Sequence, residues 1–463
     1  MMSASSARRE LRAAGKLCLS LALLGSTFVT SSVAQQSSAI PMQLTLEQAI
    51  NFALKHNHSI HLRSLSVEQM QSKKDEARSD YLPQIKTSGS VLHVTELAGV
   101  QIPAGALGNF PATGPVPSTP LTIGQGGLTG YAGGVGLEQP LTQLFRIHQA
   151  NIAARQDVLV AQDQLEQTQD AIALQVRQLY YNILINQQKL KASQDQLAAA
   201  QIKDEESRSD VARGNALEIV ELQSEAAILQ AQQANLTLRL QGNDLRRQLA
   251  DVLGLPVETP LDLDPGAAAV ALSIPSRADA IRIALDQNQD LKTARQTLIK
   301  AQAGLTAAKD AYIPDVTGLS RYSYQSGVPL LAHNFGTFGF SLSYDLFDGG
   351  RREAKIREAR TELHSAEVIV DKLKSEIEVQ VQGIYDRVDE LRQMVDVAEQ
   401  VVRVRTEAAR LADRQFEQTA ALNSARSQNH ADLASATASL LEADCGLSLA
   451  EADLKRMVGQ MPR

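Results

Sequence analysis

The segment TFGFSLSYDLFDGGR, residues 337–351, decides the fold of this chain. Large apolar residues alternate in it with small or polar ones, and the large set is Phe338, Phe340, Leu342, Tyr344 and Leu346. A period of two places one kind of side chain on each face of a β-strand. Because no proline occurs from residue 330 to residue 461, the segment predicts a two-faced strand that leads into a long helix.

A matching segment occurs earlier, at residues 131–141, with the sequence YAGGVGLEQPL. Tyr131, Val135 and Leu137 keep the apolar phase there. The two segments belong to a longer duplication. Residues 45–93 align with the chain 231 positions later, and residues from 136 onward align 205 positions later, so the first copy carries 26 extra residues. A repeat of this length indicates duplication of one structural unit.

Each copy has the same predicted order of a helix, a β-hairpin and a very long helical segment. The helix opens with a capping-box pattern in both copies, at residues 45–48 and 276–279,. It ends before proline in both, at Pro83 and Pro314, because a residue that precedes proline is pushed out of the helical conformation.

The chain therefore divides into four parts. We expect a signal peptide at residues 1–34, a first repeat at 35–254, a linker at 255–275 and a second repeat at 276–463. The linker is rich in proline,. The first repeat holds the extra residues in a long loop, 97–127, between the two strands of its hairpin.

The regions after the hairpins predict unusually long helices. Residues 141–255 contain no proline, and glycine is absent from residue 137 to residue 213. A run of about 70 residues without helix breakers would be about 100 Å long. Its apolar residues step by three, four and seven positions, which is typical of a coiled-coil seam, here interrupted by polar Asn186. The seam consists of Leu165, Ile172, Val176, Leu179, Ile183, Leu190 and Leu197.

The N-terminus predicts export. Four basic residues precede an apolar run from Leu17 to Val29, and small residues follow at 32–34, which is the pattern of a cleaved secretory signal peptide,. Cys18 would leave with this leader, and Cys445 would remain as a single thiol without an intrachain disulfide,. No later window reaches the ~20 apolar residues that a membrane-spanning helix requires.

Composition excludes several classes of function. The formal charge of the chain is −7, and removing a leader of four basic residues and Glu10 leaves about −10. An acidic chain with 4% aromatic residues and no tryptophan is a poor nucleic-acid binder,. The sequence contains no nucleophile elbow, nucleotide loop or paired metal-ligand motif, so we expect no enzyme activity, no cofactor and no metal site.

Three local patterns have competing interpretations. His56, His58 and His61 could bind a metal, but no carboxylate or cysteine joins them at ligand spacing, which favours a polar helix end,. The glycine-rich stretch 124–127 lacks the lysine of a phosphate loop,. An aromatic set could form the core of a soluble sheet, although its small, polar alternate face favours a lipid-facing band. The set is Tyr322, Tyr324, Phe335, Phe338, Phe340 and Tyr344.

These features together resemble the TolC-type outer-membrane efflux proteins. The resemblance covers nearly all of residues 45–460 and includes the junction sequences GLEQPL, at 136–141, and YDLFDGGR, at 344–351. It implies a mainly α fold with β-hairpins, in which three chains share a 12-stranded β-barrel continuous with a periplasmic α-helical barrel. The physical argument agrees, since four strands leave open edges that lipid does not tolerate.

The chain departs from the family pattern at several positions. Proline is absent after Asn57 and Asn288, where the resemblance implies a kink. The tips of the two long helical hairpins would contain Gly214 and Thr419, although the family pattern has glycine in both. Near the second tip, Ala425 and Gln428 replace aspartates, with Arg426 between them.

The resemblance implies an outer-membrane exit channel of a tripartite efflux or type I secretion system, docked by a periplasmic adaptor and an inner-membrane pump. The alternative is a periplasmic coiled-coil adaptor, which would not need lipid-patterned hairpins. In the channel, loop 97–127 would lie outside the cell, and the even-numbered residues 338–346 would face lipid,. At the periplasmic tips, Gly214 and Thr419 would lie at the docking surface. The charges available for a gate are Glu218, Glu221, Arg414 and Arg426.

Overall fold

The computed structural model describes residues 42–95, 99–124, 129–264, 274–327, 332–418 and 422–461. The expected signal peptide, residues 1–34, lies outside the described residues. Residues Met42–Arg463 form one compact unit that is mainly helical. Among the described residues, no helix combines the length and the apolar character needed to cross a membrane.

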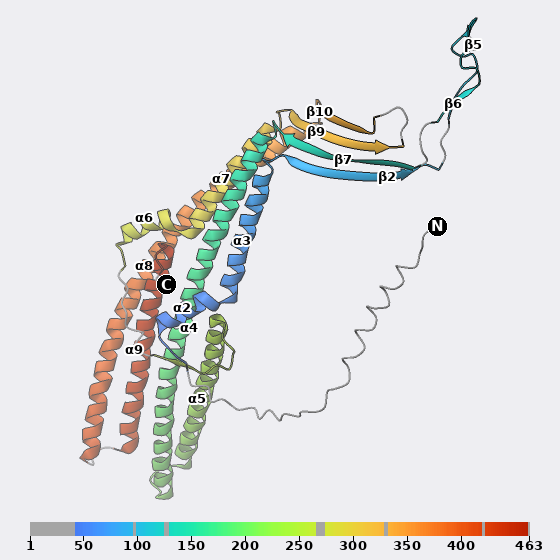
Figure 1. Ribbon diagram of the computed structural model, residues 1–463. Coiled ribbons are helices and arrows are strands. Elements are labelled where there is room, and N and C mark those ends of the chain that lie inside the picture. The colour runs from blue at the N-terminus through green and yellow to red at the C-terminus, as the bar shows by residue number, and fades with distance from the viewer. Residues whose placement is uncertain are drawn as a thin grey trace, which may run out of the picture. The chain divides into compact units, whose positions relative to one another are not determined.

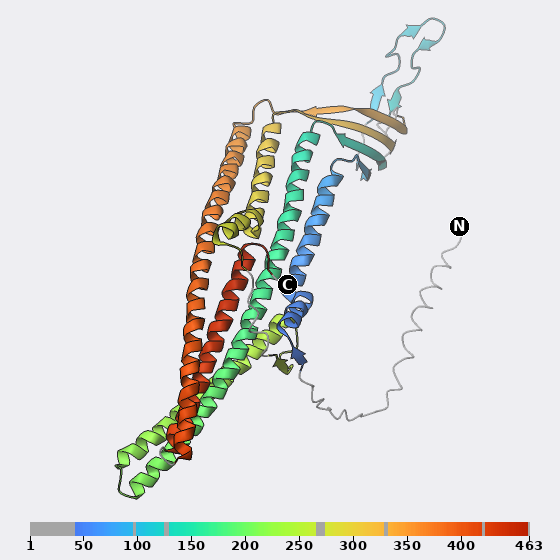
Figure 2. The same ribbon diagram turned by 90° about the vertical axis from the view of Figure 1, so that its left-hand side faces the viewer.

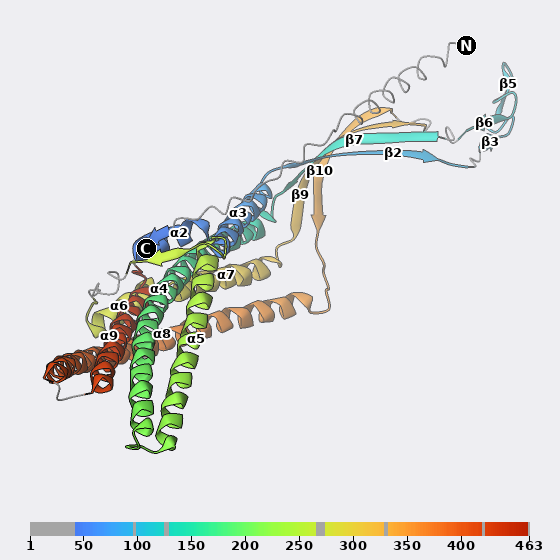
Figure 3. The same cartoon turned by 90° about the horizontal axis from the view of Figure 1, so that it is seen from below.

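The main sheet is a four-stranded antiparallel sheet made of one hairpin from each copy. The first copy contributes β2 (Gln84–His93) and β7 (Thr129–Pro140), and the second contributes β9 (Asp315–Ser326) and β10 (Asn334–Ser343). The order is β10-β9-β7-β2, so the copies join where β7 pairs with β9. Seen from below, β9 and β10 run in a different direction from β2 and β7, so the sheet is strongly curved (Figure 3).

The register extends the alternation of β10 across all four strands. Phe338 pairs with Ser320, which pairs with Leu137, which pairs with Ile85. Paired residues point to the same side of a sheet. One side, the apolar face, comprises Ile85, Val91, Tyr131, Val135, Leu137, Val316, Tyr322, Tyr324, Phe338, Phe340 and Leu342. The other side, the polar face, includes Lys86, Ser88, Gly134, Glu138, Asp315, Arg321, Ser323, Thr337, Gly339 and Ser341.

The polar face carries its own cross-strand interactions. Lys86 Nζ lies 3.0 Å from Glu138 Oε2 on the neighbouring strand. Arg321 donates a hydrogen bond of 2.9 Å to Ser88 Oγ across two strands. Phe335 also lies on this face, because its register partner is Ser323. Phe335 therefore lies on the opposite side of the sheet from the predicted aromatic band, and its assignment to that band was wrong.

The long loop of the first copy contains short strands of its own. The strands β3 (Val100–Ile102) and β6 (Leu121–Ile123) pair antiparallel, and β4 (Asn109–Phe110) pairs with β5 (Gly114–Pro115). These pairs continue the β2–β7 hairpin beyond the end of the main sheet (Figure 1). The sequence predicted a long loop here and did not identify these short strands, because its prolines and glycines indicate turns.

In each copy, the helix before the hairpin is divided in two by an asparagine. The first copy has α2 (Leu46–His56) and α3 (His58–Ser79), and the second has α6 (Arg277–Gln287) and α7 (Gln289–Asp310). Asn57 Oδ1 accepts from the backbone N–H of Ser59 at 2.8 Å and so caps α3. The break implied by the family resemblance is thus present without proline, because the asparagine side chain caps the second helix.

Four long helices complete each chain, and they are α4 (Leu144–Ala212), α5 (Glu218–Leu253), α8 (Arg351–Glu417) and α9 (Asn423–Met457). The helix α4 has 69 residues and α8 has 67, which confirms the predicted lengths. The helices α8, α7, α4 and α3 lie side by side and continue the four strands of the sheet (Figure 2).

The main core lies midway along α4. It packs α2 and the end of α5 against buried residues of the predicted seam, including Ile172, Val176 and Ile183. The interrupting Asn186 is buried and donates to Leu238 O at 3.1 Å. Its amide therefore has a partner, as a buried polar group requires.

A small parallel sheet closes this core. The strand β1 (Met42–Leu44) pairs with β8 (Leu261–Leu263), which lies in the linker predicted from its prolines. The buried Tyr180 hydroxyl lies 3.0 Å from Leu44 O and 2.8 Å from Asp264 O. Burial raises the pKa of this hydroxyl to about 12, so it remains a hydrogen-bond donor that ties both strands to α4.

A second core repeats the first around α6, α7, α8 and the end of α9. Asn288 caps α7 as Asn57 caps α3, and it donates to Met457 O at 3.3 Å where Asn57 donates to Val252 O at 2.8 Å. Tyr385, the counterpart of Tyr180, hydrogen-bonds Pro275 O. Gly254 and Gly459 follow the C-terminal ends of α5 and α9, with φ of 71° and 69°. The duplication thus holds at the level of single hydrogen bonds.

Candidate functional site at the ends of the helical hairpins

The turn between α4 and α5 is built around Gly214. Asn215 N–H donates to Asp210 O at 2.8 Å, and Gly214 N–H donates to Val211 O at 2.9 Å. These two bonds form a Schellman motif, which needs a left-handed residue, and Gly214 has φ of 77°,. A Cβ added to Gly214 would meet no atom within 4 Å. The backbone of this turn is therefore open to an approaching molecule on the Gly214 side.

The corresponding turn of the second hairpin contains Thr419. This residue lies outside the described residues, in the gap 419–421. The helix α8 ends at Glu417, and α9 begins at Asn423. The predicted docking role of Thr419 stays a prediction.

The charges of the first hairpin form a network within that hairpin. Arg208 Nε lies 2.9 Å from Asp204 Oδ2 and 3.7 Å from Glu221 Oε1. Ser224 Oγ donates to Asp204 Oδ1 at 2.6 Å, and the Asp204 side chain is buried. The network ties α4 to α5 near the turn. Glu218 is exposed in the first turn of α5, and no ion pair of Glu218 occurs in the described ranges.

The charges of the second hairpin meet at Asp413. Arg426 Nε lies 2.7 Å from Asp413 Oδ1, and His430 Nε2 lies 2.9 Å from the same oxygen. The His430 hydrogen bond, followed by that of Arg426, lowers the pKa of Asp413. The Arg426 guanidinium also lies over the ring of Phe416, 5.1 Å from its centroid,. Arg414 is exposed and takes no part in this cluster.

The structure brings two of the four predicted gate charges into ion pairs, but not with each other. Glu221 pairs with Arg208, and Arg426 pairs with Asp413. Within one chain, over the ranges that the structure describes, no ion pair joins Glu218 or Glu221 to Arg414 or Arg426. The sequence could not find Asp204, Arg208, Asp413 and His430, because the rotation of each helix about its axis decides which charges face the partner helix.

The two hairpins are held together by contacts between α4 and α9. Glu206 on α4 accepts from the backbone N–H of Ser424 at 3.0 Å and so caps α9. Lys189 Nζ lies 2.8 Å from Glu442 Oε2, and Gln196 donates to Ser435 Oγ at 3.1 Å. A groove of about 470 Å³ lies between α4, α5 and α9 near their ends. Its lining includes Lys203, Ser207, Val220, Ser224, Ser424 and Gln428.

The predicted lipid-facing residues of the strand are exposed in the single chain. Phe338 is 90% exposed, Phe340 79% and Leu342 69%. Nothing within the described chain covers them, so the alternative of a soluble sheet core does not fit one chain by itself. The strand ends at Ser343, which leaves Tyr344 and Leu346 in the connection to α8 rather than in the strand. The sequence extended the alternation past the last ladder pair, because periodicity does not mark where pairing ends.

The histidine group lies at the end of α2 and the start of α3. The ring of His56 stacks on Phe52 at 4.2 Å between centroids, and His56 Nδ1 lies 3.0 Å from Phe52 O. Among the described residues, no three His, Cys, Asp or Glu side chains gather closely enough to hold a metal ion.

Comparison with known proteins gives one family and one fold. The model of the family described as outer membrane efflux protein matches residues 49–255 and 280–460. No curated protein matches the chain. Three similar solved structures are VceC of Vibrio cholerae, CmeC of Campylobacter jejuni and MtrE of Neisseria gonorrhoeae, the last in an open state.

The structural similarity extends over most of each chain. For VceC the TM-score is 0.69 and the identity 16%, covering 89% of this chain and 96% of VceC. For CmeC the TM-score is 0.72 and the identity 14%, covering 90% of this chain and 85% of CmeC. For MtrE the TM-score is 0.68 and the identity 16%, covering 90% of this chain and 89% of MtrE. At such low identity these likenesses establish the fold.

Proposed function

This chain belongs to the outer membrane efflux protein family, and from that premise we propose that three copies of it form one passive duct. The family makes it an outer-membrane exit channel with a periplasmic extension, and the adaptor alternative is not favoured. In the proposed assembly the sheets close into a 12-stranded barrel and the long helices into a helical barrel below it. A periplasmic adaptor and an inner-membrane pump would dock at the hairpin ends.

The open edges of the main sheet carry this proposal. Its outer strands are β10 and β2, and within the described residues each pairs on one side only. An unpaired strand edge in hydrocarbon leaves backbone groups without partners at a cost of several kcal/mol each, by order of magnitude. Pairing β10 with β2 of the next copy would remove both edges. The exposed apolar face would then meet lipid, and the polar face would line the duct.

The duplication predicts how neighbouring copies pack below the sheet. Within one chain, α4 of the first repeat packs against α9 of the second. The equivalent contact for α8 is therefore with α5 of the next copy. Both helices show a matching exposed stripe at heptad spacing. The stripe of α5 is Leu222, Leu229, Leu236 and Leu240, and that of α8 is Met394, Val397, Val401, Val404 and Leu411.

The repeat also gives the register of this interface. The contact of Gln196 with Ser435, transferred by the repeat offset of 205 residues, places Val401 beside Gln230 of the next copy. The same transfer explains why Leu240 is 64% exposed whereas its counterpart, Cys445, is fully buried. Within the chain, α4 covers Cys445. In the proposed assembly, α8 of the neighbouring copy would cover Leu240.

Cross-linking in the outer membrane tests the assembly. The double variant Val401→Cys/Gln230→Cys, treated with a short bifunctional thiol reagent, should give dimer and trimer bands from the outer-membrane fraction. Burial raises the pKa of the native Cys445 thiol to about 12, so Cys445 should contribute little background. The pair Thr406→Cys/Gln230→Cys is the control, because Thr406 lies about 140° around α8 from Val401. A soluble periplasmic monomer, or equal cross-linking of both pairs, would contradict the proposal.

The open backbone at Gly214 supports the docking part of the proposal. Gly214→Trp should block export while the trimer stays in the membrane, because its bulk would fill the side that lies open. Gly214→Asn is the control, since asparagine tolerates a positive φ and adds little volume. If the tryptophan variant exports as well as the asparagine variant, the adaptor does not approach this turn.

A further inference from the structure

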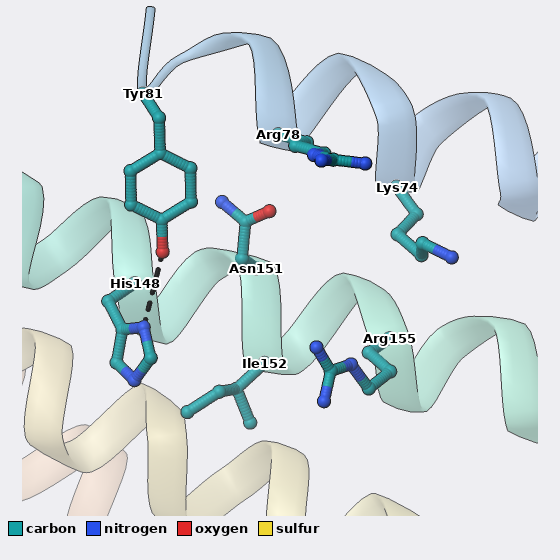
Figure 4. Close-up of a pocket in the computed structure, with 7 residues that line it drawn as sticks. All are labelled: Lys74, Arg78, Tyr81, His148, Asn151, Ile152 and Arg155. Atoms are coloured by element: carbon teal, nitrogen blue, oxygen red, sulfur yellow. Dashed lines mark hydrogen bonds between the residues drawn. The ribbon is translucent and has the colours of Figure 1, made fainter.

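A basic cavity lies between α3 and α4, directly below the main sheet. It has a volume of about 610 Å³ and is shown in Figure 4. Lys74, Arg78 and Tyr81 line it from the side of α3, and His148, Asn151, Ile152 and Arg155 line it from α4. No carboxylate is part of its lining.

The cations of this cavity are Lys74, Arg78 and Arg155. Over the described ranges, no ion pair involves Lys74, Arg78 or Arg155. The nearest carboxylate along α4, Asp157, is bound to Lys300 at 2.6 Å. Two cations on α3 and one on α4 therefore line one cavity, and Arg78 and Arg155 are exposed, so an anion that enters the cavity can reach them.

The polar groups between the cations are fixed by the protein. Tyr81 Oη lies 3.2 Å from His148 Nδ1. Asn151 Nδ2 donates to Ala77 O at 2.7 Å and to Ile147 O at 2.9 Å. The bonds of Tyr81 to His148, drawn in Figure 4, and of Asn151 to Ala77 O join the α3 side of the cavity to α4. Among the described residues, no hydrogen bond engages the side chains of Lys74, Arg78 or Arg155, which leaves their donors available.

Two contacts place the cavity on the side of the apolar face. Arg146 pairs with Asp315, which belongs to the polar face. Residues two apart on a helix point about 200° away from each other, so His148 points to the opposite side. In agreement, Gln139, which the register puts on the apolar side, donates to Tyr81 O at 3.2 Å.

The depth of the cavity also matches a membrane boundary. Tyr81 lies just before β2, whose apolar residues begin at Ile85. From Tyr81 to Lys74 the helix rises about 10 Å at ~1.5 Å per residue. The polar headgroup layer on each side of a bilayer is about 5–8 Å thick. If the sheet spans the hydrocarbon, Arg78, about 4.5 Å from Tyr81, thus lies at the depth of the phosphate groups, and Lys74 lies just beyond them.

We propose that this cavity binds the phosphate of an anionic glycerophospholipid from the periplasmic leaflet. The inference rests on the proposed function, since it requires the apolar face to lie in the bilayer. Arg78 and Arg155 would hold the phosphate oxygens by charge-assisted hydrogen bonds, with Lys74 as a further charge. The acyl chains would lie on the apolar face, an arrangement that a free phosphate cannot use. Basic pockets beside membrane-spanning segments recognise headgroups in this way.

Native mass spectrometry of the purified full chain in detergent tests the proposal. The protein is mixed with equal amounts of phosphatidylglycerol and phosphatidylcholine of the same chain length, and the bound lipids are counted. Phosphatidylglycerol should be preferred. Arg78→Gln/Arg155→Gln should weaken its binding by about tenfold or more, because two charged donors are lost. The control, Arg387→Gln/Arg403→Gln, removes two exposed arginines of α8 and should bind as the natural chain does.

A competition arm identifies the source of the phosphate. Glycerol phosphate and inorganic phosphate, added at the lipid concentration, should leave the lipid bound. Displacement by either would show a phosphate site without lipid recognition and would overturn the proposal, as would equal lipid binding by the two double variants. Membrane fractionation of the same cultures tests the proposed function separately from the lipid site. If the natural chain reaches the outer membrane but shows no lipid preference, only the lipid site is refuted.

Discussion

The helices α4 and α8 occupy the same place in the two repeats, yet one is covered and the other is open. They have 69 and 67 residues. In α4, 19 residues are buried, whereas α8 buries 10. The difference follows from position, because α4 contacts α2, α3, α5, α7 and α9, whereas α8 contacts α6, α7 and α9.

Equivalent positions make the contrast sharper. Ala192 and Ala199 of α4 are 4% and 2% exposed, whereas their counterparts in α8, Val397 and Val404, are 59% and 68% exposed. The larger apolar residue therefore lies at the exposed position of the pair. Selection for a single soluble chain would not place apolar residues in this way, because a contiguous exposed apolar stripe marks an interaction surface. The comparison supports the proposal that a neighbouring copy completes the second repeat.

The largest effect is expected in the strand that leads into α8. Phe340→Arg should lower trimer recovery from the outer membrane strongly, because a charge at mid-membrane on the lipid face costs about 2–4 kcal/mol per chain. Ser341→Arg, one residue away on the polar face, should assemble nearly as the natural chain does. Trimer yield on semi-native gels measures both. Equal losses would remove the assignment of the two faces.

The next effect concerns the open stripe of α8. Val404→Asp should weaken the trimer by about 1.5–3 kcal/mol per interface, which is the value of burying one such side chain. Thr406→Asp, on the other side of the helix, introduces the same charge as a control. The temperature at which trimers dissociate reports the difference. If the two variants dissociate together, no neighbouring helix covers Val404.

The two asparagine N-caps, Asn57 and Asn288, should contribute equally to the stability of the two repeats. Asn57→Ala and Asn288→Ala each remove an N-cap and a buried side-chain hydrogen bond. Each should destabilise the chain by about 1 kcal/mol. Thermal unfolding followed by circular dichroism measures both. A loss confined to one repeat would contradict their equivalence.

The smallest effect on stability is expected at the hairpin end, where its consequence would be functional. Arg426→Glu places a second carboxylate beside Asp413 and should raise basal conductance in planar bilayers, because exposed ion pairs contribute little and shift readily. Arg426→Lys keeps the charge and should conduct as the natural protein does. Unchanged conductance in the glutamate variant would exclude Arg426 from the gate.

Local periodicity accounts for what could be predicted near the membrane. The alternation in residues 337–343 identified the strand and its two faces, and the register of all four strands extends the same faces. Phe335 was misplaced in the aromatic band, since its odd position in the strand puts it on the polar side. Each of these results depends on neighbours within a few residues along the chain.

Non-local contacts explain what was missed. The strand β8 was not recognised in the proline-rich linker, because the strand that it pairs with, β1, lies more than 200 residues earlier in the chain. The partners of Glu221 and Arg426 depend on helix rotation. The basic cavity combines Arg78 with Arg155, two residues on different helices whose relative height no local pattern fixes.

By itself the sequence determined the duplication, the lengths of the helices, the two-faced strands and the family, because these depend on spacing along one chain. Only the tertiary structure decided which charges pair at the hairpin ends, which stripes remain uncovered on α5 and α8, and where cations gather beneath the sheet. These depend on the rotation and register of long helices against one another. Packing of the whole unit sets both, since the same heptad pattern fits more than one partner.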